Sequence, residues 1–186
     1  MKTVIAECPD QSGQVSEKET VPGAPNFLGV RHVGLLASDP AALAVFYRDV
    51  MGMEVVRQTS ADHGLGGTAF LARHPDEEDH DIVLVSNAEA AHTAFRVAAL
   101  ADLLAFYQNL KEHGIPIKNC FNHVIELAVY FEDPEGHLIE VYWVTGLSSS
   151  EAHAEPINLE VPEKQLRQEV DRLVARFGAR HQTLKG

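Results

Sequence analysis

The sequence predicts an α+β fold of two β-α-β-β-β modules that lie side by side and curl their strands around a shared cleft. The first observation is an internal repeat: His32 precedes Phe46-Tyr47 by 14 positions, and His92 precedes Phe106-Tyr107 by the same 14. The second is that each half, about 60 residues long, opens with an apolar strand, continues with an amphipathic helix and ends in three strand-like segments. The length of 186 residues fits one such domain with short extensions.

The composition excludes several classes of function. Hydrophobic residues make up 45% and charged residues 23%, which is ordinary for a globular protein. No apolar run reaches the roughly 20 residues that a membrane-spanning helix requires. The net charge of −12 disfavours binding to nucleic acid and to anionic membranes. The N-terminal sequence MKTVIAECPDQSGQ lacks the apolar core of a secretory signal, so we expect a cytoplasmic protein.

Cysteine and histidine usage limits the kinds of metal site. Cys8 and Cys120 are far apart, which predicts neither a disulfide framework nor a cysteine zinc site. The chain has 10 histidines, so any metal site would use His and carboxylate ligands. Such ligands favour iron, manganese or another divalent ion, with zinc possible.

Three regions are expected along the chain. Residues 1–27 are rich in Glu, Gln, Ser, Pro and Gly and read as an N-terminal arm. Residues 28–146 form the domain, with modules at about 28–87 and 90–146. Residues 147–186 contain a linker and a C-terminal helix.

The first module begins with a strand over Phe27–Ala37, rich in apolar and β-branched residues. Ser38-Asp39-Pro40 is typical of a helix start, and Gly52 is typical of a helix end. Strands are then expected at Glu54–Thr59, Thr68–Arg73 and Asp81–Ser86. The charged segment HPDEEDHD before the last strand predicts a solvated loop, and we assign no role to its His74 and His80.

The second module repeats this order. A strand is expected over Ala91–Val97, and a helix over Ala101–His113 that Gly114 closes. Asp133–Gly136 is a strong turn signal between the last two strands. The three strands are expected near Pro116–Phe121, Glu126–Glu132 and His137–Val144.

The C-terminal region is expected to form a linker over Ser148–Pro156 and an amphipathic helix over Pro162–Phe177. Leu166, Val170 and Leu173 lie on one face of this helix. That face must pack either on its own domain or on a partner subunit.

Three segments together carry a family resemblance: RHVGLLASDP, AHTAFRV and NHVIELAVYFEDPEGHLIEVYW. With the paired modules, they resemble the vicinal oxygen chelate superfamily over roughly residues 28–146. The last segment looks most like the one-domain type I extradiol catechol dioxygenases. The resemblance implies that the strands of both modules line one metal-bearing cleft. The N-terminal arm and the C-terminal helix lie outside it.

The resemblance implies a metal site made of His32, His92 and Glu140. The sequence supports this independently for Glu140, because a carboxylate inside the apolar run LIEVYW needs a charged partner or a metal. Two imidazoles and one carboxylate suit non-haem Fe(II), and Mn(II) or another divalent metal is possible. Three protein ligands leave coordination positions open, as catalytic sites require.

Two further residues receive catalytic roles from the resemblance. Tyr130 lies ten positions before Glu140, where extradiol enzymes carry a Tyr that hydrogen-bonds a substrate oxygen. His123 lies in the stretch where these enzymes place an acid–base histidine, and imidazole has a pKa suited to that task. The match departs from some relatives, in which the histidine lies two positions earlier, where this chain has Phe121.

With the resemblance, these residues imply an extradiol ring-cleaving dioxygenase that acts on a catechol-type aromatic diol with O₂. The C-terminal helix and the resemblance favour a homodimer or higher homo-oligomer. One alternative is another metal-dependent enzyme of the superfamily: a glyoxalase, an epimerase or an antibiotic-modifying transferase. A glyoxalase would require a fourth carboxylate ligand from residues 81–87, whose centre Val83–Val85 has none. A metal-free protein that binds a small ligand is the remaining alternative.

Overall fold

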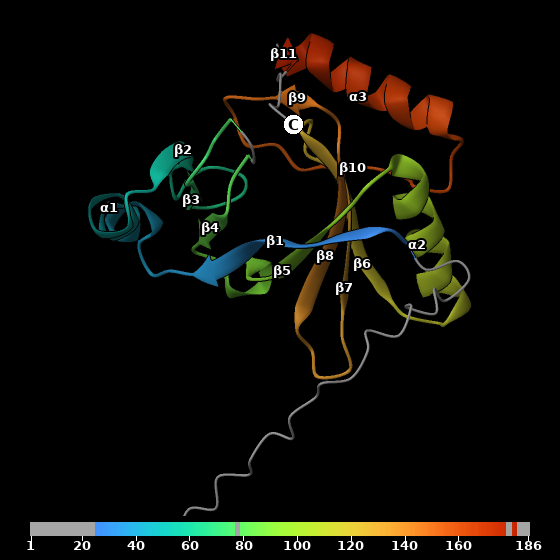
Figure 1. Ribbon diagram of the computed structural model, residues 1–186, viewed down its shortest axis with the longest axis horizontal. Helices are drawn as coiled ribbons and strands as arrows, with labels where there is room; N and C mark the ends of the chain where they lie inside the picture. Colours follow the sequence, from blue (N-terminus) through green and yellow to red (C-terminus); the bar gives the residue numbers. More distant parts are fainter. Residues whose placement is uncertain (1–24, 77–78, 178–179, 182–186) are drawn as a thin grey trace, which may run out of the picture.

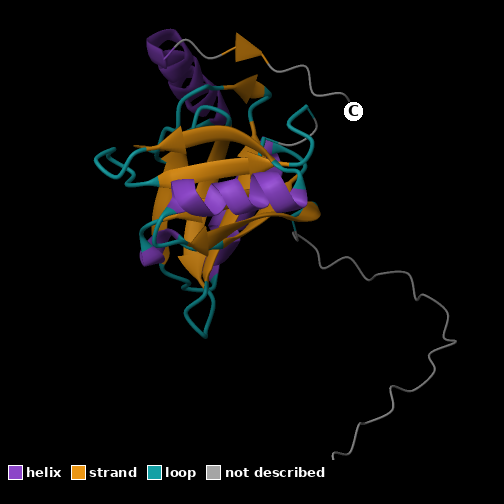
Figure 2. Cartoon of the chain, turned by 90° about the vertical axis from the view of Figure 1, so that its left-hand side faces the viewer, coloured by secondary structure: helices purple, strands orange, loops and turns teal. Residues whose placement is uncertain are grey.

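The computed structural model describes residues 25–76, 79–177 and 180–181, and a single mixed sheet organises them (Figure 1). The sheet bends into a half-barrel with helices packed against it (Figure 2). This architecture confirms the predicted α+β fold. Most of the predicted N-terminal arm lies outside the described residues. No helix in the described part of the chain is long and apolar enough to cross a membrane.

The first module has the predicted order of elements. Asp39 caps its helix by accepting a hydrogen bond from the Ala42 backbone N–H at 3.0 Å, and Pro40 is the first helical residue. Gly52 ends the helix with φ of 69°, a left-handed conformation that glycine adopts without strain. The elements are β1 (Phe27–Leu36), α1 (Pro40–Met51), β2 (Glu54–Thr59), β3 (Thr68–Ala72) and β4 (Ile82–Val85).

The second module differs from the prediction at its start. Residues Ala88–Ala90 form a short 3-10 helix, η1, because the Asn87 side chain accepts a hydrogen bond from the Glu89 N–H at 3.1 Å. The following strand therefore begins at Thr93, one residue after His92. The elements are β5 (Thr93–Val97), α2 (Leu100–Glu112), β6 (Ile117–Asn122), β7 (Glu126–Glu132) and β8 (Leu138–Val144).

The C-terminal region is more ordered than a linker followed by a helix. Glu155 pairs with Asn122, so a short strand covers the edge of β6, where unpaired backbone groups would otherwise remain. The elements are β9 (Leu147–Ser148), β10 (Glu155–Pro156), α3 (Glu163–Phe177) and β11 (Arg180–His181). The large sheet has the order β10-β6-β7-β8-β5-β1-β4-β3-β2, and β9 pairs with β11.

The two modules join through their first strands. β1 and β5 run antiparallel, and each pairs in parallel with the last strand of its own module, β4 or β8. A helix packs against the strands of each module. The arrangement places the first and last strands of both modules side by side at the centre of the sheet.

Helix α3 packs on its own domain. Its Leu166 and Leu173 are fully buried and share a hydrophobic core with Leu103 of α2 and Leu127 of β7. The predicted apolar face is thus buried within the same chain.

Replacing Leu173 by alanine should lower the free energy of unfolding by about 2–5 kcal/mol. The protein loses the transfer free energy of the removed atoms and the packing contacts around the cavity that they leave. Urea denaturation monitored by circular dichroism would measure the loss. Arg172→Ala is the matched control: its side chain is 56% exposed, and the change should stay within about 0.5 kcal/mol. Equal effects of the two substitutions would show that α3 is not part of the core.

Candidate metal centre

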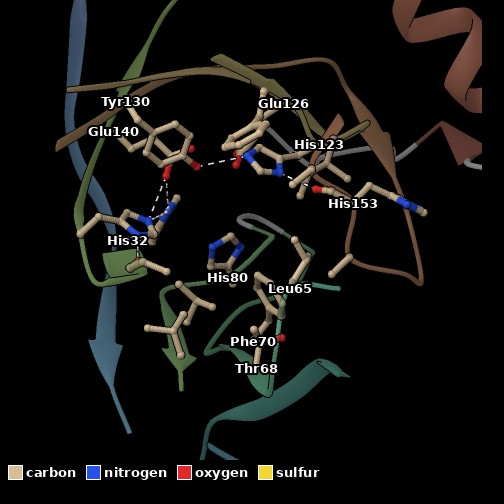
Figure 3. Close-up of a pocket in the computed structure, with 18 of the residues that line it drawn as sticks. His32, Leu65, Thr68, Phe70, His80, His123, Glu126, Tyr130, Glu140 and His153 are labelled. Atoms are coloured by element: carbon tan, nitrogen blue, oxygen red, sulfur yellow. Dashed lines mark hydrogen bonds and ion pairs between the residues drawn. The ribbon is translucent and has the colours of Figure 1, made fainter. Parts of the chain in front are cut away.

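The sheet brings three side chains from distant parts of the chain to one face, around β5. Ala94 of β5 pairs with His32 of β1 on one side and with Glu140 of β8 on the other. Directly paired residues project from the same face of a sheet, so His32 and Glu140 point the same way. His92 lies two positions before Ala94 and, by the two-residue period of extended backbone, projects from that face as well. Figure 3 shows His32 and Glu140 meeting at the edge of a cavity.

The three side chains converge on one point. His32 Nε2 lies 3.1 Å from His92 Nε2 and 3.1 Å from Glu140 Oε2, and His92 Nε2 lies 3.0 Å from the same carboxylate oxygen. His32 is 3% exposed and Glu140 is 1% exposed. Two imidazole nitrogens and a carboxylate oxygen at this spacing could hold a metal ion.

Three observations fit a divalent metal at this point. The His92 Nδ1–H donates to the Ala90 carbonyl at 2.7 Å, which leaves its Nε2 lone pair free to bind a metal. Glu140 Oε1 is buried without a hydrogen-bond partner among the described residues, a costly arrangement that a bound cation would relieve. The donor set of two nitrogens and one oxygen is that of non-haem iron and similar ions.

The charges at this point favour an ionised carboxylate. Burial by itself would raise the pKa of Glu140, but the hydrogen bonds and charges of His32 and His92 hold that pKa well below its ordinary value. Burial also works to lower the pKa of His92, and the interactions with Glu140 outweigh it, so the pKa of His92 is raised. The Glu140 carboxylate therefore carries a negative charge that interacts with both imidazoles.

The two predicted catalytic residues lie together beside this centre. His123 Nδ1–H donates to the His153 carbonyl at 2.5 Å, which leaves His123 Nε2 to accept from the Tyr130 hydroxyl at 3.1 Å. Tyr130 pairs directly with Glu140 across β7 and β8. Burial and then the charge of Glu140 raise the pKa of Tyr130 well above its ordinary value, and burial lowers the pKa of His123. The phenol is thus a protonated donor and the imidazole a neutral acceptor.

His80 was expected to lie in a solvated loop and was given no role, but it is buried beside His32. The residue is 4% exposed, and its ring lies 4.2 Å from the ring of His32, centroid to centroid. His80 Nδ1 donates to Asp79 at 2.7 Å, and Arg57 binds both oxygens of the same carboxylate. Burial and then His32 lower the pKa of His80 to about 4. One feature of the sequence could have predicted the burial of His80. The residue lies two positions before the buried strand β4, where the chain enters the cleft.

A cavity of about 310 Å³ connects these groups. It lies at the small end of the roughly 300–1,000 Å³ typical of ligand sites, which suits one small molecule. Val83 and Val85 of β4 line it, so this strand supplies no carboxylate to the centre. Figure 3 shows Leu65 and Phe70 facing the cavity from the side opposite Tyr130 and Glu140.

The family model of the Glyoxalase/Bleomycin resistance protein/Dioxygenase superfamily matches residues 29–141. The chain belongs to this superfamily. The match confirms the resemblance seen in the sequence, and it includes the three converging residues. It ends before the last residues of β8, so α3 lies outside it.

The chain is similar to two curated dioxygenases from Rhodococcus globerulus. The chain is 33% identical to biphenyl-2,3-diol 1,2-dioxygenase 2 over 121 residues and 29% identical to biphenyl-2,3-diol 1,2-dioxygenase 3 over 122 residues. Each match covers 59% of this chain and 60% of the relative, so the chain spans only about three fifths of their length. Metallothiol transferase FosB of Shouchella clausii is 32% identical over 134 residues, which cover 68% of this chain and 87% of that relative.

Two solved structures of dioxygenases share the fold. Homoprotocatechuate 2,3-dioxygenase from Brevibacterium fuscum superposes with a TM-score of 0.54 at 23% identity, covering 79% of this chain and 42% of that chain. The enzyme of the same name from Arthrobacter globiformis gives a TM-score of 0.53 at 23% identity, covering 79% and 41%.

Gly34 lies directly against His92, and Gly34→Ala should weaken metal binding at least about tenfold. The two residues exchange backbone hydrogen bonds, and a Cβ on residue 34 would lie 2.7 Å from His92 Nδ1. The ring must then move, and groups that orient a ligand are worth about 10–100-fold in metal affinity. Competition with a chelator of known affinity would measure the change.

Gly64→Ala is the control, because a Cβ there meets nothing within 4 Å. It should leave the metal affinity unchanged. Wild-type affinity in a folded Gly34→Ala variant would show that His92 does not depend on this close approach.

Proposed function

We propose that the protein is an extradiol ring-cleaving dioxygenase that opens a catechol-type aromatic with O₂ at a non-haem Fe(II). The observation that carries the proposal is the buried Glu140 carboxylate: Oε2 meets two imidazole nitrogens, and Oε1 is unpaired among the described residues, at the wall of a small cavity. The biphenyl-2,3-diol dioxygenases of Rhodococcus globerulus support the reaction class.

In this proposal His32, His92 and Glu140 hold the metal. Fe(II), when bound, supplies a Lewis-acidic and redox-active centre whose remaining positions suit two adjacent substrate oxygens and O₂. Mn(II) or another divalent ion would fit the same donors. Both atoms of O₂ enter the product as the ring C–C bond beside the hydroxyl-bearing carbons breaks, so no external reductant is required.

Tyr130 and His123 act as a pair on one substrate oxygen. The Tyr130 hydroxyl stays protonated because its pKa is raised, and its one proton is donated to His123 Nε2 at 3.1 Å, so its oxygen can accept from a diol hydroxyl bound beside Glu140. His123 Nε2 can take the Tyr130 proton as Tyr130 takes that of the diol, and return it, while the His153 carbonyl fixes the His123 tautomer. The pair therefore orients the diol and can relay a proton.

His80 is a second proton acceptor in the proposal. Its Nδ1–H is fixed on Asp79, and it makes no hydrogen bond through Nε2 with the described residues. A neutral imidazole held in this way presents Nε2 as a base, much as a buried carboxylate orients a catalytic histidine elsewhere. Because the ring lies against the His32 ring at the cavity wall, tilted by 41°, it lies within reach of a substrate at the metal centre.

The remaining parts of the proposal come from the sequence. A small aromatic diol and O₂ would be the substrates, and the protein would act in the cytoplasm as a homodimer or higher homo-oligomer. The net charge of −12 disfavours nucleic acids and anionic membranes as partners.

A second candidate is a metal-dependent thiol transferase, favoured by one observation. The FosB match covers 87% of that relative, against 60% for the dioxygenases. Consumption of a low-molecular-weight thiol without oxygen uptake would identify this activity.

The dioxygenase proposal predicts a colour change that depends on oxygen. Protein loaded with Fe(II) under anaerobic conditions and mixed with 2,3-dihydroxybiphenyl should stay colourless, then form a yellow ring-opened product when air is admitted. Product absorbance and an oxygen electrode would follow the reaction, with one O₂ consumed per diol. Glu140→Gln should lose the metal and the reaction together. No oxygen uptake with any catechol would contradict the proposal.

Replacement of His80 by glutamine should lower kcat by about 100-fold while the metal content stays unchanged, because general acid–base groups contribute about 10²–10⁴-fold. His123→Gln should lower kcat and also raise KM, since Tyr130 loses its partner. Steady-state kinetics with metal analysis of each variant would test both effects. His74→Gln, at an exposed position outside the cavity, is the control. Wild-type kcat in His80→Gln would remove this residue from the mechanism.

A further inference from the structure

We propose that the cavity selects catechols with uncharged or positively charged ring substituents and rejects those that carry a carboxylate. The inference rests on the proposed function and concerns the charge and shape of the same cavity. Its basis is the set of charged side chains that line the cavity, together with the interactions that Arg57 already makes.

Arg57 is the one Arg or Lys among the described residues that line the cavity, and it is fully engaged. Its guanidinium binds both oxygens of Asp79, donates to the Ser149 carbonyl at 3.2 Å, and lies 4.7 Å from the centre of the Phe70 ring. The side chain is only 6% exposed. An incoming carboxylate would have to displace Asp79, which would leave that largely buried carboxylate with His80 as a partner but without its guanidinium. Arg57 is therefore no receptor for an anionic substrate.

More carboxylates than Arg or Lys side chains line the cavity. Glu126 is a buried part of the wall, and Glu89 and Glu151 are exposed residues at its border. Glu140 adds a further negative charge, which the metal would neutralise in the loaded protein. A substrate carboxylate would thus leave water for a site whose described lining offers no free Arg or Lys and presents several like charges.

The remaining lining favours apolar substituents. Leu65 and Phe70 face the cavity from the first module, across from Tyr130 and Glu140, and His80 lies between the two sides (Figure 3). Phe121 and Ile125 line it from the second module. A diol held at the metal centre would direct its ring and substituents at these side chains, where burial of apolar surface stabilises the complex.

Binding measured without oxygen tests the selectivity apart from the reaction. The Fe(II)-loaded protein is titrated anaerobically by calorimetry at pH 8, above the ordinary histidine pKa of about 6.5. Three ligands of similar size are compared: 4-ethylcatechol, 3,4-dihydroxyphenylacetate and 2-(3,4-dihydroxyphenyl)ethylamine. The acid should bind at least about tenfold more weakly than 4-ethylcatechol, and the amine at least as tightly. Equal or tighter binding of the acid would overturn the inference, as would no binding of any of the three.

A charge-reversal variant tests the border carboxylates. Glu89→Lys combined with Glu151→Lys should improve the affinity for the acid relative to 4-ethylcatechol by about threefold or more. Glu112→Lys with Glu163→Lys makes the same change of charge at positions that do not line the cavity and should leave the ratio unaltered. An unchanged ratio in the first variant would overturn the role given to Glu89 and Glu151.

Air admitted after each titration separates the two proposals. Selective binding without ring opening would overturn the proposed function and leave the selectivity standing. Ring opening of the acid and 4-ethylcatechol with equal affinity would overturn the selectivity and leave the proposed function standing.

Discussion

The Glu140 carboxylate lies almost wholly out of contact with water, and the surrounding structure is arranged around its charge. One oxygen meets His32 and His92, and the other has no partner among the described residues. A buried charge is tolerated only with compensating partners, so β1, which carries His32, and β5, which directly follows His92, must keep their registers. The pairing of Ala94 with both His32 and Glu140 sets those registers. A shift of one residue in either strand would turn a histidine or the carboxylate to the opposite face.

The sequence was sufficient for the fold because the same pattern occurs twice. The spacing of His32 and His92 from their Phe-Tyr pairs predicted two equivalent modules, and caps such as Asp39 and Gly52 marked the helix ends. The convergence of the two histidines with Glu140 followed from the family resemblance, and the geometry agrees with it. The short strands inside the expected linker could not be predicted, because residues 155–156 form a strand only by pairing with the edge of β6.

His80 illustrates a limit of reading charge patterns along a chain. The run of charged residues around it is typical of a solvated loop, and for the exposed His74 that reading was right. His80 is nevertheless buried. It donates a hydrogen bond to Asp79, and Arg57 of β2 supplies the positive charge that stabilises the Asp79 carboxylate in the cleft. Arg57 lies 22 positions before Asp79, and no sequence pattern links these two residues. Long-range compensation of this kind is visible only once the strands are assembled.

The C-terminal segment joins the cavity to a part of the chain that the superfamily model does not cover. Ala152, His153 and Ala154 line the cavity, and the His153 ring stacks on Phe177 at the end of α3 with a centroid distance of 4.0 Å. The strands that carry the proposed metal ligands and this part of the cavity wall therefore belong to separable stretches of sequence. During divergence, the tail could be exchanged or remodelled while His32, His92 and Glu140 stay in place. On the proposed function, such a chain could acquire a new substrate without passing through an intermediate that cannot bind a metal.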